Sequence, residues 1–233
     1  MPPDKDVADL CLGIYANPGL PAVTWDRFDD GKDSDQICWG VKVVDDCDVL
    51  VFRGSITFED WRRDFDAWAN PFGHAAIGPV HPGFLLGLDQ VLQEYRDFRG
   101  NSGRKLVVAG HSLGAGRASI LCGLAIVAGI VPAGRVVFGE PRPGFPPLAR
   151  LLASIPDSRS YKNGKFGSFE HDLVTDVPVR IGPLQYVHPT PLVEVSALPP
   201  PDDEWGIFSY HHMQLYARAL AQGAIRPESV ATA

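Results

Sequence analysis

The stretch from Lys105 to Gly129 reads KLVVAGHSLGAGRASILCGLAIVAG and carries the strongest signal for the fold. Lys105 to Ala109 predicts a buried strand, and Leu113 to Gly129 predicts a nearly all-apolar helix. The turn between them, Gly110 to Gly114, has the pattern G-x-S-x-G with Ser112 at its centre. A serine held on a tight turn between strand and helix is typical of a catalytic nucleophile. The alternatives are an ordinary junction with a capping serine, or a phosphate-cradling loop, but no glycine-rich nucleotide motif accompanies the turn.

Elsewhere in the chain, patterns of helices and strands alternate. The periodicity predicts helices over Val7 to Tyr15, Phe84 to Phe98, Pro147 to Ala153 and Tyr210 to Ala221. Strands are expected over Ile37 to Val44, Val49 to Phe52, Val136 to Phe138 and Ser158 to Lys162. The polar segment Asp26 to Asp35 predicts a connection rich in turns. This alternation predicts an α/β fold with a mostly parallel central sheet flanked by helices, and one domain over residues 1–233.

The charge distribution excludes several classes of partner. The 233 residues carry a net charge of −7, and the first 70 hold 15 acidic against 7 basic side chains. No region is basic enough to bind nucleic acid, and an acidic surface disfavours anionic membranes. The longest apolar run, Ile120 to Val131, is too short to span a bilayer. The N-terminus MPPDKDVADL lacks the features of a signal peptide, which predicts an intracellular protein or one whose signal has been removed.

Three further motifs flank the serine turn, namely VFRGS at residues 51–55, VHPGF at residues 80–84 and FGEPRPG at residues 138–144. Together with the turn, they resemble the class 3 lipase family of the α/β-hydrolase superfamily, which includes the triacylglycerol lipases of filamentous fungi. The resemblance runs from about residue 50 to residue 220. It implies the α/β-hydrolase fold and a serine hydrolase that cleaves carboxylic esters without a cofactor.

A serine nucleophile needs a base and an orienting carboxylate, and in this superfamily both follow the serine in the chain. The segment from Asp172 to Pro178 resembles the family pattern D-x-V-x-x-V/L-P, which implies that Asp172 is the acid. Asp176 is the competing candidate. The family usually has Asn-Gly only a few residues before this Asp, whereas here Asn163-Gly164 precedes it by eight or nine. The intervening KFGSFEH therefore resembles an insertion beside the site.

The segment that begins at His211 matches the pattern H-x-M-x-x-Y-x-x-A-L of bacterial family members. The resemblance implies that His211 is the base and that Ser112, Asp172 and His211 form the catalytic triad. His212 stays an alternative, because helical periodicity does not distinguish two residues that both begin a helix. The other late histidines, His171 and His188, are weaker candidates.

The family also implies an oxyanion hole and a lid. Ser55 and Leu113 would bind the oxyanion through their backbone N–H groups. A lid helix is expected at about residues 57–68, with Phe58, Trp61 and Phe65 facing the acyl pocket, although the same stripe fits an ordinary helix packed on the core. The sequence contains no metal-binding pattern, so no metal is expected.

The expected substrates are acylglycerols or similar neutral esters, and a lipid interface is one place where the protein would meet them. The other activities that the sequence leaves open are those of a phospholipase A1-like enzyme, a feruloyl-type esterase or an acyltransferase. A catalytically silent binding protein on the same fold is the alternative from a different class of function.

Overall fold

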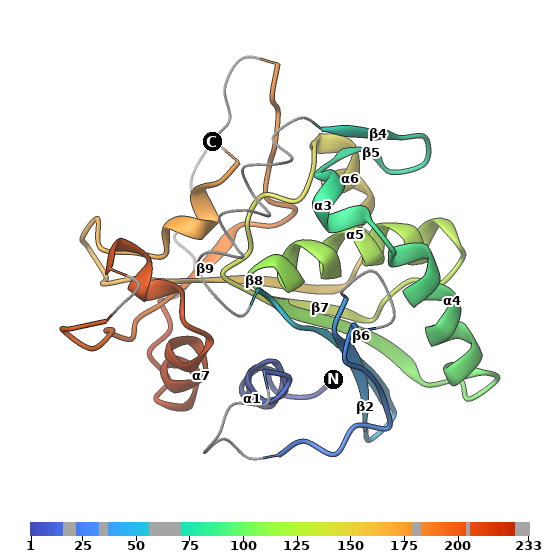
Figure 1. The fold of residues 1–233 in the computed structure, drawn as a ribbon, viewed down its shortest axis with the longest axis horizontal. Helices are drawn as coiled ribbons and strands as arrows, with labels where there is room; N and C mark the ends of the chain where they lie inside the picture. The colour runs from blue at the N-terminus through green and yellow to red at the C-terminus, as the bar shows by residue number, and fades with distance from the viewer. Residues whose placement is uncertain (16–21, 33–36, 56–70, 179–182, 204–205, 227–233) are drawn as a thin grey trace.

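The structure, a computed structural model, describes residues 1–15, 22–32, 37–55, 71–178, 183–203 and 206–226. Within these ranges a seven-stranded sheet has the order β1-β2-β3-β6-β7-β8-β9 (Figure 1). Its strands are β1 (Arg27–Asp29), β2 (Trp39–Val44), β3 (Cys47–Phe52), β6 (Lys105–His111), β7 (Gly134–Phe138), β8 (Asp157–Asn163) and β9 (Leu192–Val195). The pairs from β3 to β9 are parallel, and β1 and β2 add an antiparallel edge. This architecture confirms the predicted mostly parallel α/β sheet.

Helices cover both faces of the sheet, as parallel strands require (Figure 1). They are α1 (Asp4–Gly13), α3 (Pro82–Leu85), α4 (Leu88–Arg99), α5 (Leu113–Val127), α6 (Pro146–Leu152) and α7 (Met213–Ala221). The side chains of β6 alternate between two cores, since Leu106 and Val108 pack with α3 to α6 while Val107 and Ala109 pack with α1 and α7. No helix in the described part of the chain is long and apolar enough to cross a membrane.

The carboxyl ends of the parallel strands meet along one edge of the sheet. The register places Phe52 of β3 beside Gly110 of β6, and His111 beside Phe138 of β7. The segments that follow these strands therefore begin side by side, which is where open α/β sheets place their functional groups. Two short 3-10 helices, η1 (Leu173–Asp176) and η2 (Gly206–His211), come from later parts of the chain, and a separate hairpin joins β4 (Phe72–His74) to β5 (Gly78–Val80).

Three sequence predictions of local structure are wrong in detail. The expected helix from Phe84 to Phe98 is broken into α3 and α4, because Gly87 adopts a left-handed φ of 77°. The polar segment after Asp26 contains the edge strand β1, whose short half-exposed pattern has no apolar run to reveal it. The last helix begins at Met213 rather than Tyr210, since η2 occupies the residues before it.

The predicted lid, about residues 57–68 with Phe58, Trp61 and Phe65, lies outside the described residues.

A fully buried ion pair ties the middle of the sheet to α5. Arg135 of β7 donates to Glu140 over 2.9 Å, and neither side chain is exposed. Ser119 and Ser160 donate to the same carboxylate, and Thr190 accepts from the guanidinium at 2.9 Å. Burial by itself would raise the pKa of Glu140, but the charge of Arg135 and the contacts with His188 and Ser119 together lower that pKa. The carboxylate is therefore ionised and completely hydrogen-bonded.

Glu140→Gln is expected to lower the free energy of unfolding by about 3–5 kcal/mol, because it leaves the Arg135 charge buried without a counterion. The matched control is Glu94→Gln, whose partner Arg27 lies 2.6 Å away and is partly exposed, as Glu94 is. That control should cost less than about 1 kcal/mol. Urea unfolding measures both variants. Equal losses in the two would contradict a special role for the buried pair.

Candidate functional site

Ser112 occupies a strained turn between β6 and α5. Its φ of 61° and ψ of −128° are rare for a residue with a side chain, and it is only 2% exposed. Its N–H donates to the carbonyl of Phe138 over 3.0 Å, which holds the turn against β7. A Cβ on Gly110 would lie 2.3 Å from the carbonyl oxygen of Gly114, so the turn requires glycine there. The predicted strained turn is therefore present, and its geometry explains the glycines around the serine.

Asp172 and His211 lie beside this turn. The Nδ1 atom of His211 is 2.7 Å from Oδ2 of Asp172, and both side chains are buried. A Cβ on Gly139 would lie 2.7 Å from that same oxygen and 2.8 Å from Cε1 of His211. Gly139 directly follows Phe138, whose carbonyl accepts from the Ser112 N–H. The pair thus packs against the chain segment that supports the serine turn.

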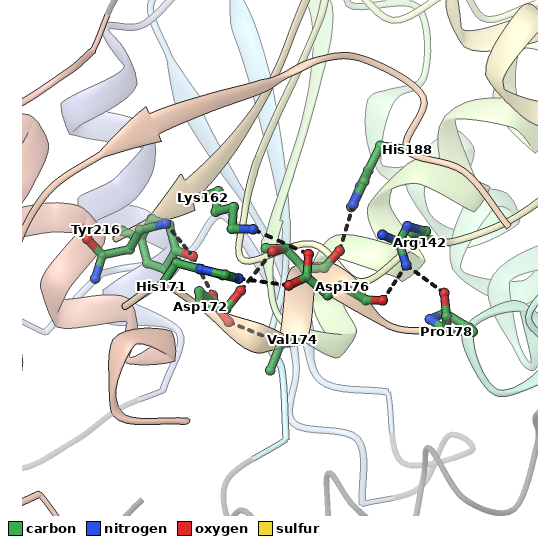
Figure 2. Close-up of polar contacts among 11 residues, drawn as sticks. Arg142, Lys162, His171, Asp172, Val174, Asp176, Pro178, His188 and Tyr216 are labelled. Carbon is green, nitrogen blue, oxygen red and sulfur yellow. Dashed lines mark hydrogen bonds and ion pairs between the residues drawn. The ribbon is translucent and has the colours of Figure 1, made fainter. Parts of the chain in front are cut away.

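Asp172 is held as an ionised acceptor. It precedes η1 and accepts the N–H of Val174 at Oδ1 over 2.9 Å (Figure 2). The hydroxyl of Tyr216, from α7, donates to its Oδ2. Burial alone would raise the pKa of Asp172, but the nearby His211 and the hydrogen bonds from His211 and Tyr216 together lower it. An ionised Asp172 fixes a proton on Nδ1 of His211 and so leaves Nε2 as its basic atom.

The competing candidates have other partners. Asp176, whose side chain is 44% exposed, bonds to His171 at 2.8 Å and to Lys162 at 3.3 Å (Figure 2). His212 lies 2.9 Å from Asp203. Neither contact involves the serine turn, so the structure brings Asp172 and His211 together and leaves Asp176 and His212 in separate, partly buried pairs.

His188 does not contact Asp172 through its hydrogen bonds but helps to hold the segment that carries it. Its Nε2–H donates to the carbonyl of Thr175 over 2.8 Å, and its ring lies 3.7 Å from Glu140. Thr175 in turn donates from its hydroxyl to the backbone carbonyl of Asp172 over 2.8 Å. These contacts hold η1, the short helix that presents Asp172.

Of the two predicted oxyanion-binding residues, Leu113 follows Ser112 in the chain, and Ser55 follows a residue that packs against the serine turn. Ser55 follows Gly54, where an added Cβ would be 2.9 Å from Cβ of Ser112 and 2.6 Å from the carbonyl of His111. Leu113 is the first residue of α5, so its N–H belongs to the end of the helix where donors lack intrahelical partners. The positive end of the helix dipole lies at the same place, which favours a negative charge there.

Gly139 and Tyr216 are site residues that the sequence reasoning did not assign. Gly139 has a φ of 55°, and the space beside it is taken by Asp172 and His211. Gly139 lies in the FGEPRPG motif, and Tyr216 lies five residues after His211 in the H-x-M-x-x-Y pattern, so both positions stood within recognised motifs. Both motifs were used to recognise a family rather than to assign a role.

Segment 165–171, which follows Asn163-Gly164, lines a pocket of about 220 Å³ through Phe166, Phe169 and His171, together with Lys162 and Glu194. Neither Ser112 nor His211 contributes to it. Within the described ranges, no group of three or more His, Cys, Asp or Glu side chains is arranged to hold a metal ion.

Comparison with known proteins shows that the chain is similar to lipases. The model of the family described as lipase (class 3) matches residues 49–181. A lipase of Rhizomucor miehei is 27% identical over 195 residues, which cover 72% of this chain and 52% of that protein. The chain therefore spans about half the length of this curated relative.

Solved structures show the same fold. The lipase-propeptide complex of Rhizomucor miehei matches with a TM-score of 0.63 and 20% identity, over 83% of this chain and 67% of that one. Lipase II from Rhizopus niveus matches with a TM-score of 0.64 and 22% identity, over 83% and 78%. The lipase from Rhizopus microsporus var. chinensis matches with a TM-score of 0.64 and 18% identity, over 91% and 84%. The α/β-hydrolase fold expected from the motifs is confirmed.

Proposed function

Because this chain belongs to the class 3 lipase family, we propose that it hydrolyses carboxylic esters, most directly acylglycerols or similar neutral esters, through an acyl-Ser112 intermediate. The observation that carries the proposal is the buried Asp172–His211 pair packed against the strained turn of Ser112. The family resemblance expected from the sequence motifs is confirmed by the family match. The roles of the individual residues are the content of the proposal.

In the proposed first step, Nε2 of His211 takes the proton of Ser112 as Oγ attacks the ester carbonyl carbon. Asp172 holds the imidazole through Nδ1 and stabilises the positive charge that forms on it. The tetrahedral intermediate carries its negative charge on the former carbonyl oxygen. Its C–O bond to the alcohol then breaks, and His211 returns the proton to the leaving alkoxide.

The proposed oxyanion hole consists of the backbone N–H groups of Ser55 and Leu113, together with the Ser55 hydroxyl. Two observations support it: Gly54 abuts the serine turn, and α5 begins at Leu113. Donors that are already oriented toward a developing charge cost no reorganisation during the reaction. In the second half of the cycle, water attacks the acyl group with His211 again as base, which releases the carboxylic acid and frees Ser112.

The assignment of the acid predicts a large effect of Asp172→Asn. Without the carboxylate, His211 is no longer held in the tautomer that leaves Nε2 basic, and kcat should fall by roughly 10⁴. Steady-state kinetics on a soluble p-nitrophenyl ester measure this loss. The matched control is Asp176→Asn, which removes a partly exposed carboxylate bonded to His171 and Lys162 and should leave kcat nearly unchanged. The opposite pattern would make Asp176 the acid.

A hydrolysis profile over p-nitrophenyl esters from acetate to palmitate, with and without an emulsified interface, tests the proposed function. Ester hydrolysis that Ser112→Ala abolishes is the expected result. Preference for long chains with a gain at the interface indicates a lipase, whereas preference for short soluble esters indicates an esterase. Phospholipid and feruloyl esters in the same series distinguish the related activities.

A catalytically silent protein would hydrolyse none of these esters and would not react with a fluorophosphonate at Ser112.

Three expectations from the sequence stay predictions. They are the lid at residues 57–68, the acyl contacts of Phe58, Trp61 and Phe65, and the single domain over residues 1–233. One similar solved structure, a fungal lipase-inhibitor complex, provided a model for interfacial activation in lipases. An interfacial gain in the profile would be the first support for such a lid in this chain.

A further inference from the structure

His111, the residue before Ser112, bridges two distant parts of the chain. Its Nε2 lies 2.7 Å from the backbone carbonyl oxygen of His211, and its Nδ1 lies 2.7 Å from the hydroxyl oxygen of Tyr15. That hydroxyl is in turn 3.1 Å from the backbone nitrogen of Gly54. His111 is only 4% exposed. The ester-cleavage mechanism proposed above uses neither His111 nor Tyr15.

The direction of each hydrogen bond follows from the chemistry of its partners. A carbonyl oxygen only accepts, so Nε2 of His111 carries a proton and donates to His211. Burial and the nearby His211 lower the pKa of His111 well below its usual value, so the ring is neutral and its Nδ1 accepts. Burial raises the pKa of Tyr15, whose hydroxyl therefore keeps its proton and donates to Nδ1. The same hydroxyl oxygen accepts the N–H of Gly54.

The result is one chain of three hydrogen bonds, from Gly54 through Tyr15 and His111 to His211. Gly54 adjoins Ser55 of the proposed oxyanion hole, and His111 adjoins the nucleophile. The ring of His111 also packs on that of His211, with 4.6 Å between centroids and 30° between planes. A Cβ on Gly54 would lie 2.5 Å from the Tyr15 hydroxyl, so there is no room for a larger residue than glycine at this contact. These hydrogen bonds therefore connect the backbone next to Ser55, the residue before Ser112 and the backbone of His211.

We propose that Tyr15 and His111 are positioning residues for the hydrolysis, an inference that rests on the proposed function. They hold the strand end that carries Ser55 and the loop that carries His211 in register with Ser112. The proposed mechanism gives neither side chain a bond to make or break. A misplacement of about 1 Å at a reacting group can lower a rate about a hundredfold, so small movements of these backbones matter.

The neutral state of His111 is compatible with the positive charge that forms on His211 in the proposed reaction. During the proposed cycle His211 becomes positively charged, and its ring lies against that of His111 in a tilted arrangement. A second positive charge at this distance would oppose proton transfer, whereas a neutral ring that donates to the His211 carbonyl does not. The hydrogen bond from Tyr15 to Nδ1 occupies the only atom where an extra proton could bind.

The test compares three variants by active-site titration with a fluorophosphonate and by kinetics on p-nitrophenyl butyrate. Tyr15→Phe removes the hydroxyl, His111→Phe removes both ring nitrogens, and His111→Gln keeps an amide donor at the position of Nε2. Kcat per titrated site should fall by about 10- to 100-fold in Tyr15→Phe and His111→Phe, with KM changed less than about threefold. His111→Gln should recover much of the loss, since its amide can still donate to the His211 carbonyl.

Tyr95→Phe is the matched control, because Tyr95 is a fully buried tyrosine whose hydroxyl likewise donates to a side chain, that of Asp48, at 3.1 Å. It should lower thermal stability without changing kcat per titrated site. If Tyr15→Phe behaves in the same way, and His111→Gln is no better than His111→Phe, the positioning role is wrong and the contacts only stabilise the fold. A wild-type protein that is neither labelled at Ser112 nor active on any ester would instead overturn the proposed function, and this inference with it.

Discussion

Replacement of Ser112 by alanine is expected to lower kcat for ester hydrolysis by about 10⁶, to the level left by binding and oxyanion contacts alone. The reason is that the hydroxyl of Ser112 is the group proposed to form the acyl intermediate. The structure supports a nearly isosteric test, because the Ser112 backbone is held by its N–H bond to Phe138 and by the close packing of Gly110. The substitution should therefore remove the nucleophile and leave the turn in place.

The control is Ser154→Ala, just after α6, where the Ser154 hydroxyl donates to the carbonyl of Leu151 at the surface. Its kcat should equal that of the wild type. Fluorophosphonate should label the wild type and Ser154→Ala, but not Ser112→Ala, as read by the mass of the intact protein. Substantial hydrolysis by Ser112→Ala would mean that another residue is the nucleophile.

The second large effect is expected at His211. In His211→Asn the amide nitrogen stands near the place of Nδ1 and can still donate to Asp172, while the basic Nε2 is absent. Kcat should again fall by about 10⁶, because serine and histidine act as a unit and loss of either is about as costly as loss of both. Since the bond to Asp172 is kept, the midpoint of thermal unfolding should change much less than in His211→Ala.

His212→Asn is the matched control for this variant. His212 is the N-cap of α7 and pairs with Asp203 near the surface, so its loss should leave kcat close to that of the wild type. Both variants are measured on the same soluble ester over a range of substrate concentrations. An active His211→Asn together with an inactive His212→Asn would reverse the assignment of the base.

The parts of the fold that could be predicted are those with a strong local pattern. The strand β6 and the helix α5 were predicted within two residues, because both are almost wholly buried and read as unbroken apolar runs. The edge strand β1 was missed, since three half-exposed residues have no periodicity of their own and pair only because β2 lies beside them. The break at Gly87 was missed because apolar spacing continues across it, while the left-handed turn depends on how α3 and α4 pack.

In the candidate site, too, only the residue with a strong local pattern could be predicted from its neighbours in the chain. Ser112 could be recognised from neighbours within two positions, since the glycines that its turn requires are adjacent in the chain. Asp172 and His211 were favoured only through resemblance to a family. Their local patterns fitted Asp176 and His212 nearly as well, because periodicity does not say which of several nearby side chains faces inward.

The sequence alone was therefore sufficient to predict the strand, turn and helix between Lys105 and Gly129. It was also sufficient to predict the family to which the chain belongs. The pairing of Asp172 with His211, the room left by Gly139, and the contact between Tyr15 and His111 were decided only by the tertiary structure. These groups are separated by 39 and 96 positions in the two hydrogen-bonded pairs. A hydrogen bond or a close approach between such distant residues depends on how the sheet brings its strand ends together, and no local pattern encodes that distance.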